Sequence, residues 1–172
     1  MGDRLKPIEY ETLYKSNTFI SAKYKSTLLE NQITSLALTR IQQKLKDEST
    51  ELIAEIYPGE LKKIFESSNN IYRTLKNISS SLSGRTILIE DNNGNFVTFP
   101  IIQKASYIDG VFTVRFNEEV RPLISNLTRD YTPLEISVLT SVKSNYTFRL
   151  YELFEREMYE KNRKFVKELN CV

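Results

Sequence analysis

The sequence predicts an α+β domain, in which amphipathic helices precede two β-hairpins and further helices follow them. Two observations support this fold class. Apolar residues recur at intervals of three and four up to residue 82, whereas beyond Gly84 the period changes to two until residue 116. The chain has 172 residues, of which 40% are hydrophobic, enough apolar material for one buried core. We therefore expect a single domain over residues 1–172.

The first predicted helix covers residues 28–46. Thr27 and Glu30 form a capping box at its start, because the hydroxyl and the carboxylate can each bond the other residue's amide. Its apolar positions recur at helical spacing. A short strand is expected over residues 52–57, ended by Pro58-Gly59, and a short second helix around Leu61, Ile64 and Phe65.

A third helix is predicted after a turn at residues 67–70, with Asn70 at its N-terminal end. Its apolar positions are spaced four, three and four apart, and they are Ile71, Leu75, Ile78 and Leu82. We expect Gly84 to end this helix as a left-handed C-cap.

Two hairpins are predicted next. Residues 85–90 are expected to form the first strand, and the Asn-Gly pair in residues 91–95 favours a tight loop after it. Residues 96–107 are expected to form the second strand of this hairpin, in which Pro100 indicates an edge position or a bulge. Asp109-Gly110 then turns the chain into a strand over residues 111–116, whose apolar face is Phe112, Val114 and Phe116.

The remainder is predicted to be helical. We expect helices near residues 118–127, over residues 133–142 and from after Ser144 to about residue 164. The inner face predicted for the last helix consists of Thr147, Leu150, Tyr151, Phe154 and Met158. Its outer face has three i,i+4 ion pairs, Glu152–Arg156, Glu157–Lys161 and Glu160–Lys164.

Missing residue types exclude most enzyme classes. There is no histidine, so Ser-His-Asp and Cys-His catalysis and histidine-based metal sites are excluded. A single cysteine, Cys171, excludes disulfides within the chain and CxxC zinc sites, and five scattered glycines form no phosphate-binding loop. We expect no catalytic residue, no metal and no cofactor. No membrane span or secretory signal is expected, and the location expected is the cytoplasm.

The net charge of +2 conceals an uneven distribution. Residues 12–46 carry six bases and one acid, residues 47–61 carry five acids and no base, and residues 62–89 carry five bases and one acid. Two basic stretches in a nearly neutral chain are expected if one face meets a polyanion. Solvated helix faces would give the same counts, so charge alone leaves both interpretations open.

The order helix, strand, helix, turn, helix, β-hairpin is that of a winged helix, a helix-turn-helix with a β-hairpin wing, here followed by additional C-terminal helices. In this fold the third helix enters the major groove of DNA. Its polar side chains are suited to base edges and phosphates, and the candidates are Asn70, Arg73, Lys76, Asn77 and Ser80. Arg85 and Lys104 are the basic candidates in the hairpin strands.

The hairpins are apolar on both faces, so a second surface must cover them. That surface is either the later helices of this chain or a partner chain. The expected wing tip, residues 91–95, has an acid and no base, which argues against insertion into a minor groove.

Several separated segments resemble the initiator (Rep) proteins of iteron-containing bacterial plasmids. They are Tyr14-Lys15-Ser16-Asn17, Phe19-Ile20-Ser21-Ala22, residues 28–32, Lys104-Ala105-Ser106-Tyr107, residues 112–116 and the run of residues 146–154, YTFRLYELF. The resemblance extends from about Tyr14 to Phe154.

The resemblance implies two tandem winged-helix domains, of which this chain is the first and the second is absent. It implies binding to double-stranded origin iterons, homodimers that repress the protein's own gene, and host initiator and helicase proteins as partners. By position the third helix is the DNA candidate. The dimer candidates are Ile87, Ile89, Phe96, Val97, Phe99 and Ile101. Arg149, Tyr151 and Phe154 match the strongest motif and are interpreted as packing residues.

Two alternatives remain open at this point. One is a stand-alone winged-helix transcriptional repressor. The other is a pure protein-interaction or dimerisation domain, suggested by the apolar hairpins and by the acidic excess over residues 90–160.

Overall fold

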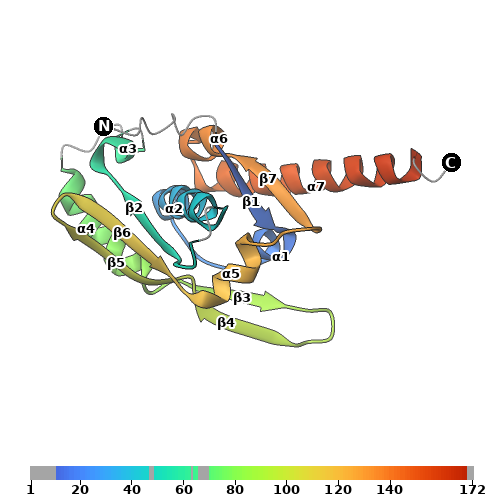
Figure 1. Cartoon of the computed structure of the whole chain (residues 1–172), viewed down its shortest axis with the longest axis horizontal. Helices are drawn as coiled ribbons and strands as arrows, with labels where there is room; N and C mark the ends of the chain where they lie inside the picture. Colours follow the sequence, from blue (N-terminus) through green and yellow to red (C-terminus); the bar gives the residue numbers. More distant parts are fainter. Residues whose placement is uncertain (1–10, 47–48, 63, 66–69, 170–172) are drawn as a thin grey trace.

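The computed structural model describes residues 11–46, 49–62, 64–65 and 70–169, with side chains as far as Asn162. A long helix, α2 (Leu28–Lys46), runs through the centre, and three small antiparallel sheets and the remaining helices surround it (Figure 1). One sheet has three strands in the order β2-β6-β5, and the other two are the pairs β1-β7 and β3-β4.

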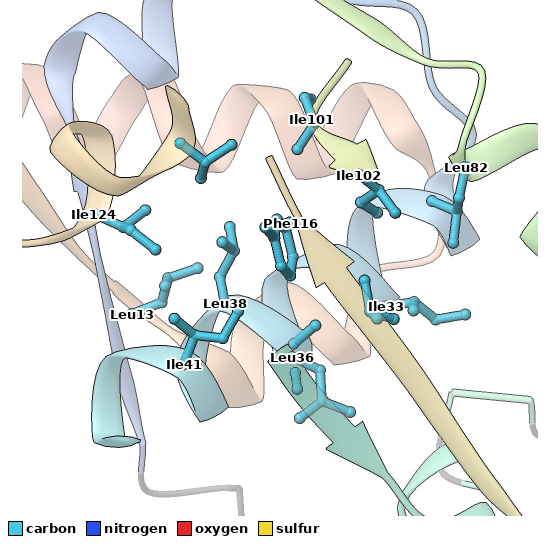
Figure 2. Close-up of a cluster of buried hydrophobic side chains, with 14 of the residues drawn as sticks. Leu13, Ile33, Leu36, Leu38, Ile41, Leu82, Ile101, Ile102, Phe116 and Ile124 are labelled. Carbon is cyan, nitrogen blue, oxygen red and sulfur yellow. The ribbon is translucent and has the colours of Figure 1, made fainter. Parts of the chain in front are cut away.

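Helix α2 begins at the predicted capping box. The Thr27 amide donates to the Glu30 carboxylate at 2.9 Å, and the Glu30 amide donates to the Thr27 hydroxyl at 3.3 Å. The helix is buried on most of its surface. Its side chains Ile33, Leu36, Leu38 and Ile41 belong to one apolar cluster with residues of other elements, among them Leu13, Phe116 and Ile124 (Figure 2).

Two buried glutamines of α2 hydrogen-bond to backbone groups. Gln32 donates to three carbonyl groups around the end of α6 (Ile136–Ser141), at 3.1 to 3.2 Å. Gln42 accepts from the Tyr14 amide and donates to the carbonyl oxygens of Tyr14 and Ile124. These bonds satisfy backbone groups that would otherwise be buried without partners.

The winged-helix elements follow α2. They are β2 (Ile53–Ile56), α3 (Pro58–Leu61), α4 (Ile71–Leu82), β5 (Ile102–Ile108) and β6 (Val111–Phe116). The predicted third helix and the buried face of residues 111–116 are confirmed. The second helix predicted around Leu61, Ile64 and Phe65 is wrong in position, because α3 begins at Pro58 and ends at Leu61, and Ile64 lies in a turn. The turn predicted at residues 67–69 lies outside the described residues.

The wing of this fold is the β5–β6 hairpin, since β6 pairs with both β5 and β2. Its turn places Asp109 at φ 49° and Gly110 at φ 81°, the left-handed region that glycine adopts without steric cost. The wing tip predicted at residues 91–95 instead closes a separate ribbon of β3 (Thr86–Glu90) and β4 (Phe96–Pro100), which extends at the bottom of Figure 1.

Two local predictions near this ribbon are wrong. The strand predicted over residues 96–107 is divided into β4 and β5, because the chain leaves the ribbon after Pro100 and enters the three-stranded sheet. Proline has no amide to continue a ladder, which favours a break there. Gly84 does not adopt a left-handed conformation, and the C-cap of α4 is Ser83 in the right-handed region.

The β1–β7 sheet is absent from the sequence prediction. Strand β1 (Thr12–Ser16) pairs with β7 (Tyr131–Glu135). The first three residues of the helix predicted over residues 133–142 are therefore strand, and the helical part is limited to the short α6. The helix predicted over residues 118–127 is also shorter, with a 3₁₀ turn (Glu118–Val120) and α5 (Arg121–Ile124).

The last helix, α7 (Asn145–Leu169), is rotated relative to the prediction. Its buried side chains include Phe148 and Glu152, whereas Leu150, Phe154 and Met158 are exposed. The predicted Glu152–Arg156 pair does not form, because Glu152 is buried against Lys15 and Arg149, while Arg156 pairs with Glu157. Lys164 lies beyond the described side chains, so the pair predicted for it is not described.

Candidate nucleic-acid interface

The polar face of α4 is exposed, as predicted. Leu75, Ile78 and Leu82 are buried, and the side chains on the opposite side of the helix are accessible; these are Arg73, Lys76, Asn77 and Ser80. At 3.6 residues per turn these four positions cover an arc of about 100° and extend about 10 Å along the axis. The face therefore has the dimensions of a surface that can enter a DNA groove.

The two cations of this face, Arg73 and Lys76, have no acidic partner in the described part of the chain. Asn70 is the N-cap of α4, because its side-chain oxygen accepts a hydrogen bond from the Arg73 backbone amide at 2.9 Å. Within the residues that the structure describes, the side-chain amide group of Asn70 donates no hydrogen bond.

An aromatic pair fixes α4 against the wing. The rings of Tyr72 and Tyr107 meet edge to face with centroids 5.7 Å apart, which joins α4 to β5. Tyr72 is also exposed beside Lys76 on the helix surface. Tyr72 is not among the residues predicted from the sequence, although its position next to Arg73 on a basic helix indicates a surface role.

Arg85 lies at the C-terminal end of α4 in a half-buried ion pair. Its Nε and Nη2 atoms donate to the two oxygens of Glu30 at 3.1 and 3.3 Å, and the Ser81 hydroxyl donates to the same carboxylate. Arg85 thus joins the end of α4 to the start of α2. This contact assigns Arg85 a structural role that the sequence analysis did not anticipate.

The Glu30 carboxyl has a lowered pKa. Burial raises it, but hydrogen bonds from Ser81, from the Thr27 amide and from Arg85, together with the Arg85 charge, outweigh burial. A lowered folded-state pKa stabilises the fold above the unfolded value of about 4.3, and this stabilisation disappears as the pH falls through the folded pKa.

We therefore expect Glu30→Gln to destabilise the domain mainly at neutral pH. The difference in unfolding midpoint between wild type and variant should be largest above about pH 5 and should close as the pH falls through the lowered pKa of Glu30 in the folded state. Urea unfolding at a series of pH values measures this difference. Parallel midpoint curves for the two proteins would contradict the assignment.

Lys104 is exposed, but it lies on a different surface from the polar face of α4. In the sheet register it pairs with Arg115, an exposed residue of β6, whereas Tyr107 pairs with the buried Phe112. Lys104 therefore lies on the outer face of the sheet, opposite the face through which Tyr107 contacts α4. Arg115 is an additional cation that the sequence analysis did not single out.

The six dimer candidates are divided between core and surface. Ile87, Phe99 and Ile101 are buried within this chain, Ile89 is partly buried, and Phe96 and Val97 are exposed near the ribbon tip. The chain itself thus covers most of the apolar ribbon that was expected to need a second surface.

The strongest sequence motif forms a buried ionic cluster. The Lys15 ammonium lies 2.5 Å from Glu152, and Arg149 bonds the other oxygen of that carboxylate, the Tyr24 hydroxyl and the Ile20 carbonyl. Burial, and secondly the Glu152 charge, raise the pKa of the Tyr24 hydroxyl well above its usual range. The packing interpretation holds for Arg149 and for Tyr151, whose hydroxyl accepts from the Glu135 amide. It is wrong for Phe154, which is exposed.

A family model described as "Initiator Replication protein, WH1" matches residues 12–155 of the chain. The chain belongs to this initiator family. The match includes α4, the ribbon, the wing and the ionic cluster, and it ends within α7. The winged-helix fold predicted from the order of elements is thereby confirmed.

A solved structure of the Pi initiator protein in complex with iteron DNA has a similar fold, with a TM-score of 0.61 at 17% sequence identity. The similarity covers 86% of this chain and 64% of that one, so the chain spans just under two thirds of its neighbour's length. No curated protein matches the chain. Within the described residues, no helix is long and apolar enough to cross a bilayer and no cluster of acidic or cysteine side chains could hold a metal ion.

Proposed function

We propose that this domain acts in the initiation of plasmid DNA replication by binding repeated duplex sequences at the origin, without catalysis of its own. The observation that carries the proposal is the exposed polar face of α4, whose two cations have no acidic partner in the described structure. Family membership and the fold shared with an initiator solved on iteron DNA support it. The proposed setting is the bacterial cytoplasm.

Some polar side chains of α4 are suited to base edges and others to phosphates. Arg73 and Asn77 are suited to guanine and adenine edges, and Lys76 and Ser80 are suited to phosphate oxygens. Asn70, near the N-terminus of α4, would donate its amide group to the backbone. Lys104, on the outer face of the wing, would contact a phosphate only where the duplex reaches past the sheet edge.

A binding assay tests the proposal. A labelled duplex with direct repeats from the parent origin should bind more tightly than a shuffled duplex of equal length and composition. The logarithm of affinity should fall with log salt by about 0.9 for each phosphate contacted. Equal affinity for the two duplexes would favour non-specific binding by this domain alone. No measurable binding at 50 mM salt would contradict the proposal.

We also propose that this is the first winged-helix domain of a two-domain initiator, with the second domain supplying further base contacts. The family description and the 64% coverage of the Pi initiator chain support this division. Host initiator and helicase proteins are the further partners proposed.

Self-association is proposed for the exposed end of the ribbon. Phe96 is 69% exposed and Val97 46% exposed, and within the described residues the far edge of β4 has no strand partner. Apolar side chains beside a free strand edge favour pairing with a second copy. Sedimentation velocity over a concentration series should show a monomer–dimer equilibrium, and a strictly monomeric profile at about 200 µM protein would contradict it.

A further inference from the structure

The tip of the β3–β4 ribbon contains the one Asn-Gly pair of the sequence, Asn93-Gly94. The turn requires the glycine, because its φ of 83° lies in the left-handed region that other residues rarely adopt. Asn93 does not have a positive φ, so the turn makes no such demand for asparagine at this position. What Asn93 adds to the tip is the chemistry of its side-chain amide.

The tip is a free end, whereas the middle of the ribbon is anchored. Leu88 in β3 exchanges two backbone hydrogen bonds with Lys23, which follows α1 (Asn17–Ser21), at 3.0 and 2.9 Å. Residues 91–98 are exposed, and apart from its chain neighbours no described atom lies within 4 Å of the position that a Cβ atom on Gly94 would occupy. Water and hydroxide ion can therefore reach the tip from open solvent (Figure 1).

The hydrogen bonds of the loop leave the Asn93 side chain unrestrained. The Asp91 carboxylate accepts from the Asn93 and Asn95 backbone amides at 2.8 and 2.9 Å and from the Asn95 side chain at 2.7 Å. In the part of the chain that the structure describes, the side-chain amide of Asn93 forms no hydrogen bond. The Gly94 amide donates to the Asp91 carbonyl oxygen at 3.3 Å, which is long for a backbone hydrogen bond. The Asn93 side chain can therefore rotate towards the Gly94 nitrogen.

These features allow a succinimide ring to form. The Gly94 backbone nitrogen loses its proton to hydroxide ion and attacks Cγ of Asn93, which forms a C–N bond and closes a five-membered ring. The C–N bond of the side-chain amide breaks, and the nitrogen leaves as ammonia with a proton taken from water. A second water molecule then opens the ring at either carbonyl carbon and leaves an aspartyl or an isoaspartyl residue. The net change is one water consumed and one ammonia released.

We propose that Asn93 deamidates spontaneously in the folded protein and that the isoaspartyl product loses self-association through the ribbon. The first part of this inference stands on the tip alone. The second part rests on the self-association proposed above.

The isoaspartyl product changes the backbone of the tip. It inserts one methylene group into the main chain between the two strands, whose pairing begins at Glu90 and Phe96. A longer connection displaces this first pair of the ladder, because loop length determines the register of a hairpin. Phe96, which is 69% exposed, belongs to the apolar end proposed for self-association.

Both products also add a negative charge to an acidic tip. Hydrogen bonds, first that from the Asn95 side chain, lower the pKa of the Asp91 carboxyl from its usual value, so Asp91 is ionised at neutral pH. A carboxylate at position 93 then lies two residues from Asp91 and three from Glu90. Two copies that meet at this end bring like charges together, which opposes association.

Ageing of the full 172-residue chain tests the chemical step. Trypsin releases residues 86–104 as one peptide, and its mass spectrum shows the replacement of an amide by a carboxyl group. The rate should rise about tenfold for each pH unit, because the deprotonated fraction of an amide far below its pKa rises by that factor. An isoaspartyl methyltransferase should label the aged chain and not the fresh one.

The chain unfolded in urea provides the reference rate. Loop tips open at almost no cost in free energy, so the folded chain should be converted within about tenfold of the rate in urea. A larger difference would show that the folded loop protects Asn93 and would overturn the proposal.

Two glutamine variants locate the reaction. Asn93→Gln should slow conversion of the peptide by at least about tenfold, because glutamine must close a six-membered ring, which has a higher barrier. Asn92→Gln is the matched control, since it changes an exposed neighbour, keeps the Asn-Gly pair and should react as wild type does. Equal rates in Asn93→Gln and wild type would place the reaction at another asparagine and overturn the proposal.

Sedimentation velocity of fresh and aged chains tests the consequence. The isoaspartyl form should dimerise with a dissociation constant at least about tenfold higher, whereas Asn93→Gln aged in the same way should associate as the fresh protein does. Unchanged association of the isoaspartyl form would overturn the second part of the inference. A strictly monomeric fresh chain would contradict the self-association proposed above and this second part with it, while the mass spectrum still decides the chemical step.

Discussion

Glu152→Gln is expected to lower the free energy of unfolding by about 3–5 kcal/mol, the largest stability effect foreseen for a single side chain of this domain. Lys15 is 3% exposed and Glu152 is fully buried, so loss of the carboxylate leaves a buried ammonium without a counter-ion. The rings of Phe19 and Phe148 lie 5.0 and 5.9 Å from the ammonium, and their cation–π attraction cannot replace a full charge.

Thermal unfolding measures this effect. For a chain of this size the melting temperature should fall by roughly 10 °C or more. Glu157→Gln is the matched control, because its pair with Arg156 is exposed to solvent and should cost less than about 0.5 kcal/mol. Lys15→Met combined with Glu152→Gln should recover part of the loss, since it removes the stranded charge. A change below 1 kcal/mol in Glu152→Gln would show that the pair is not coupled in solution.

The double variant Arg73→Ala/Lys76→Ala is expected to weaken binding to the repeat duplex by at least about 100-fold at 0.1 M salt. A bidentate arginine contact is worth about 1–3 kcal/mol, and each lost phosphate contact lowers the salt slope by about 1. Both side chains are exposed, so stability should change by less than about 0.5 kcal/mol.

Asn77→Ala separates base recognition from charge. This variant should lose discrimination at one base pair of the repeat while keeping the wild-type salt slope, because no charge is removed. Lys143→Gln removes one charge at an exposed position outside α4 and serves as a single-charge control. Unchanged affinity in Arg73→Ala/Lys76→Ala would exclude α4 from the DNA contact.

Helix starts and turns were predicted correctly where a few consecutive residues determine the backbone conformation. Thr27 and Glu30 predicted the start of α2, Asn70 the start of α4, and Asp109-Gly110 the turn of the second hairpin, and the structure confirms all three. That the second hairpin, and not the first, is the wing was not predicted. Capping and turn signals act through hydrogen bonds and φ angles over a span of four residues, so they need no tertiary information.

Partners distant in sequence were not predictable in this way. Strand β1 pairs with β7 across about 120 residues, and period-two patterns of only five residues did not indicate that pairing. The inner face of α7 was misplaced for a related reason. Leu150, Phe154 and Met158 are exposed, whereas Glu152 on another face of α7 is buried. Glu152 forms its ion pair with Lys15, which lies 137 residues earlier in the chain.

The sequence by itself determined the α+β class, the order of the winged-helix elements and the polar face of α4 that includes Arg73 and Lys76. These follow from periodicity and from local hydrogen bonding. Only the tertiary structure decided that Arg85 is bound to Glu30 and that Ile87 and Phe99 are covered by their own chain. Ion pairs and packing depend on which surfaces meet in space, and that information is absent from the spacing of residues along the chain.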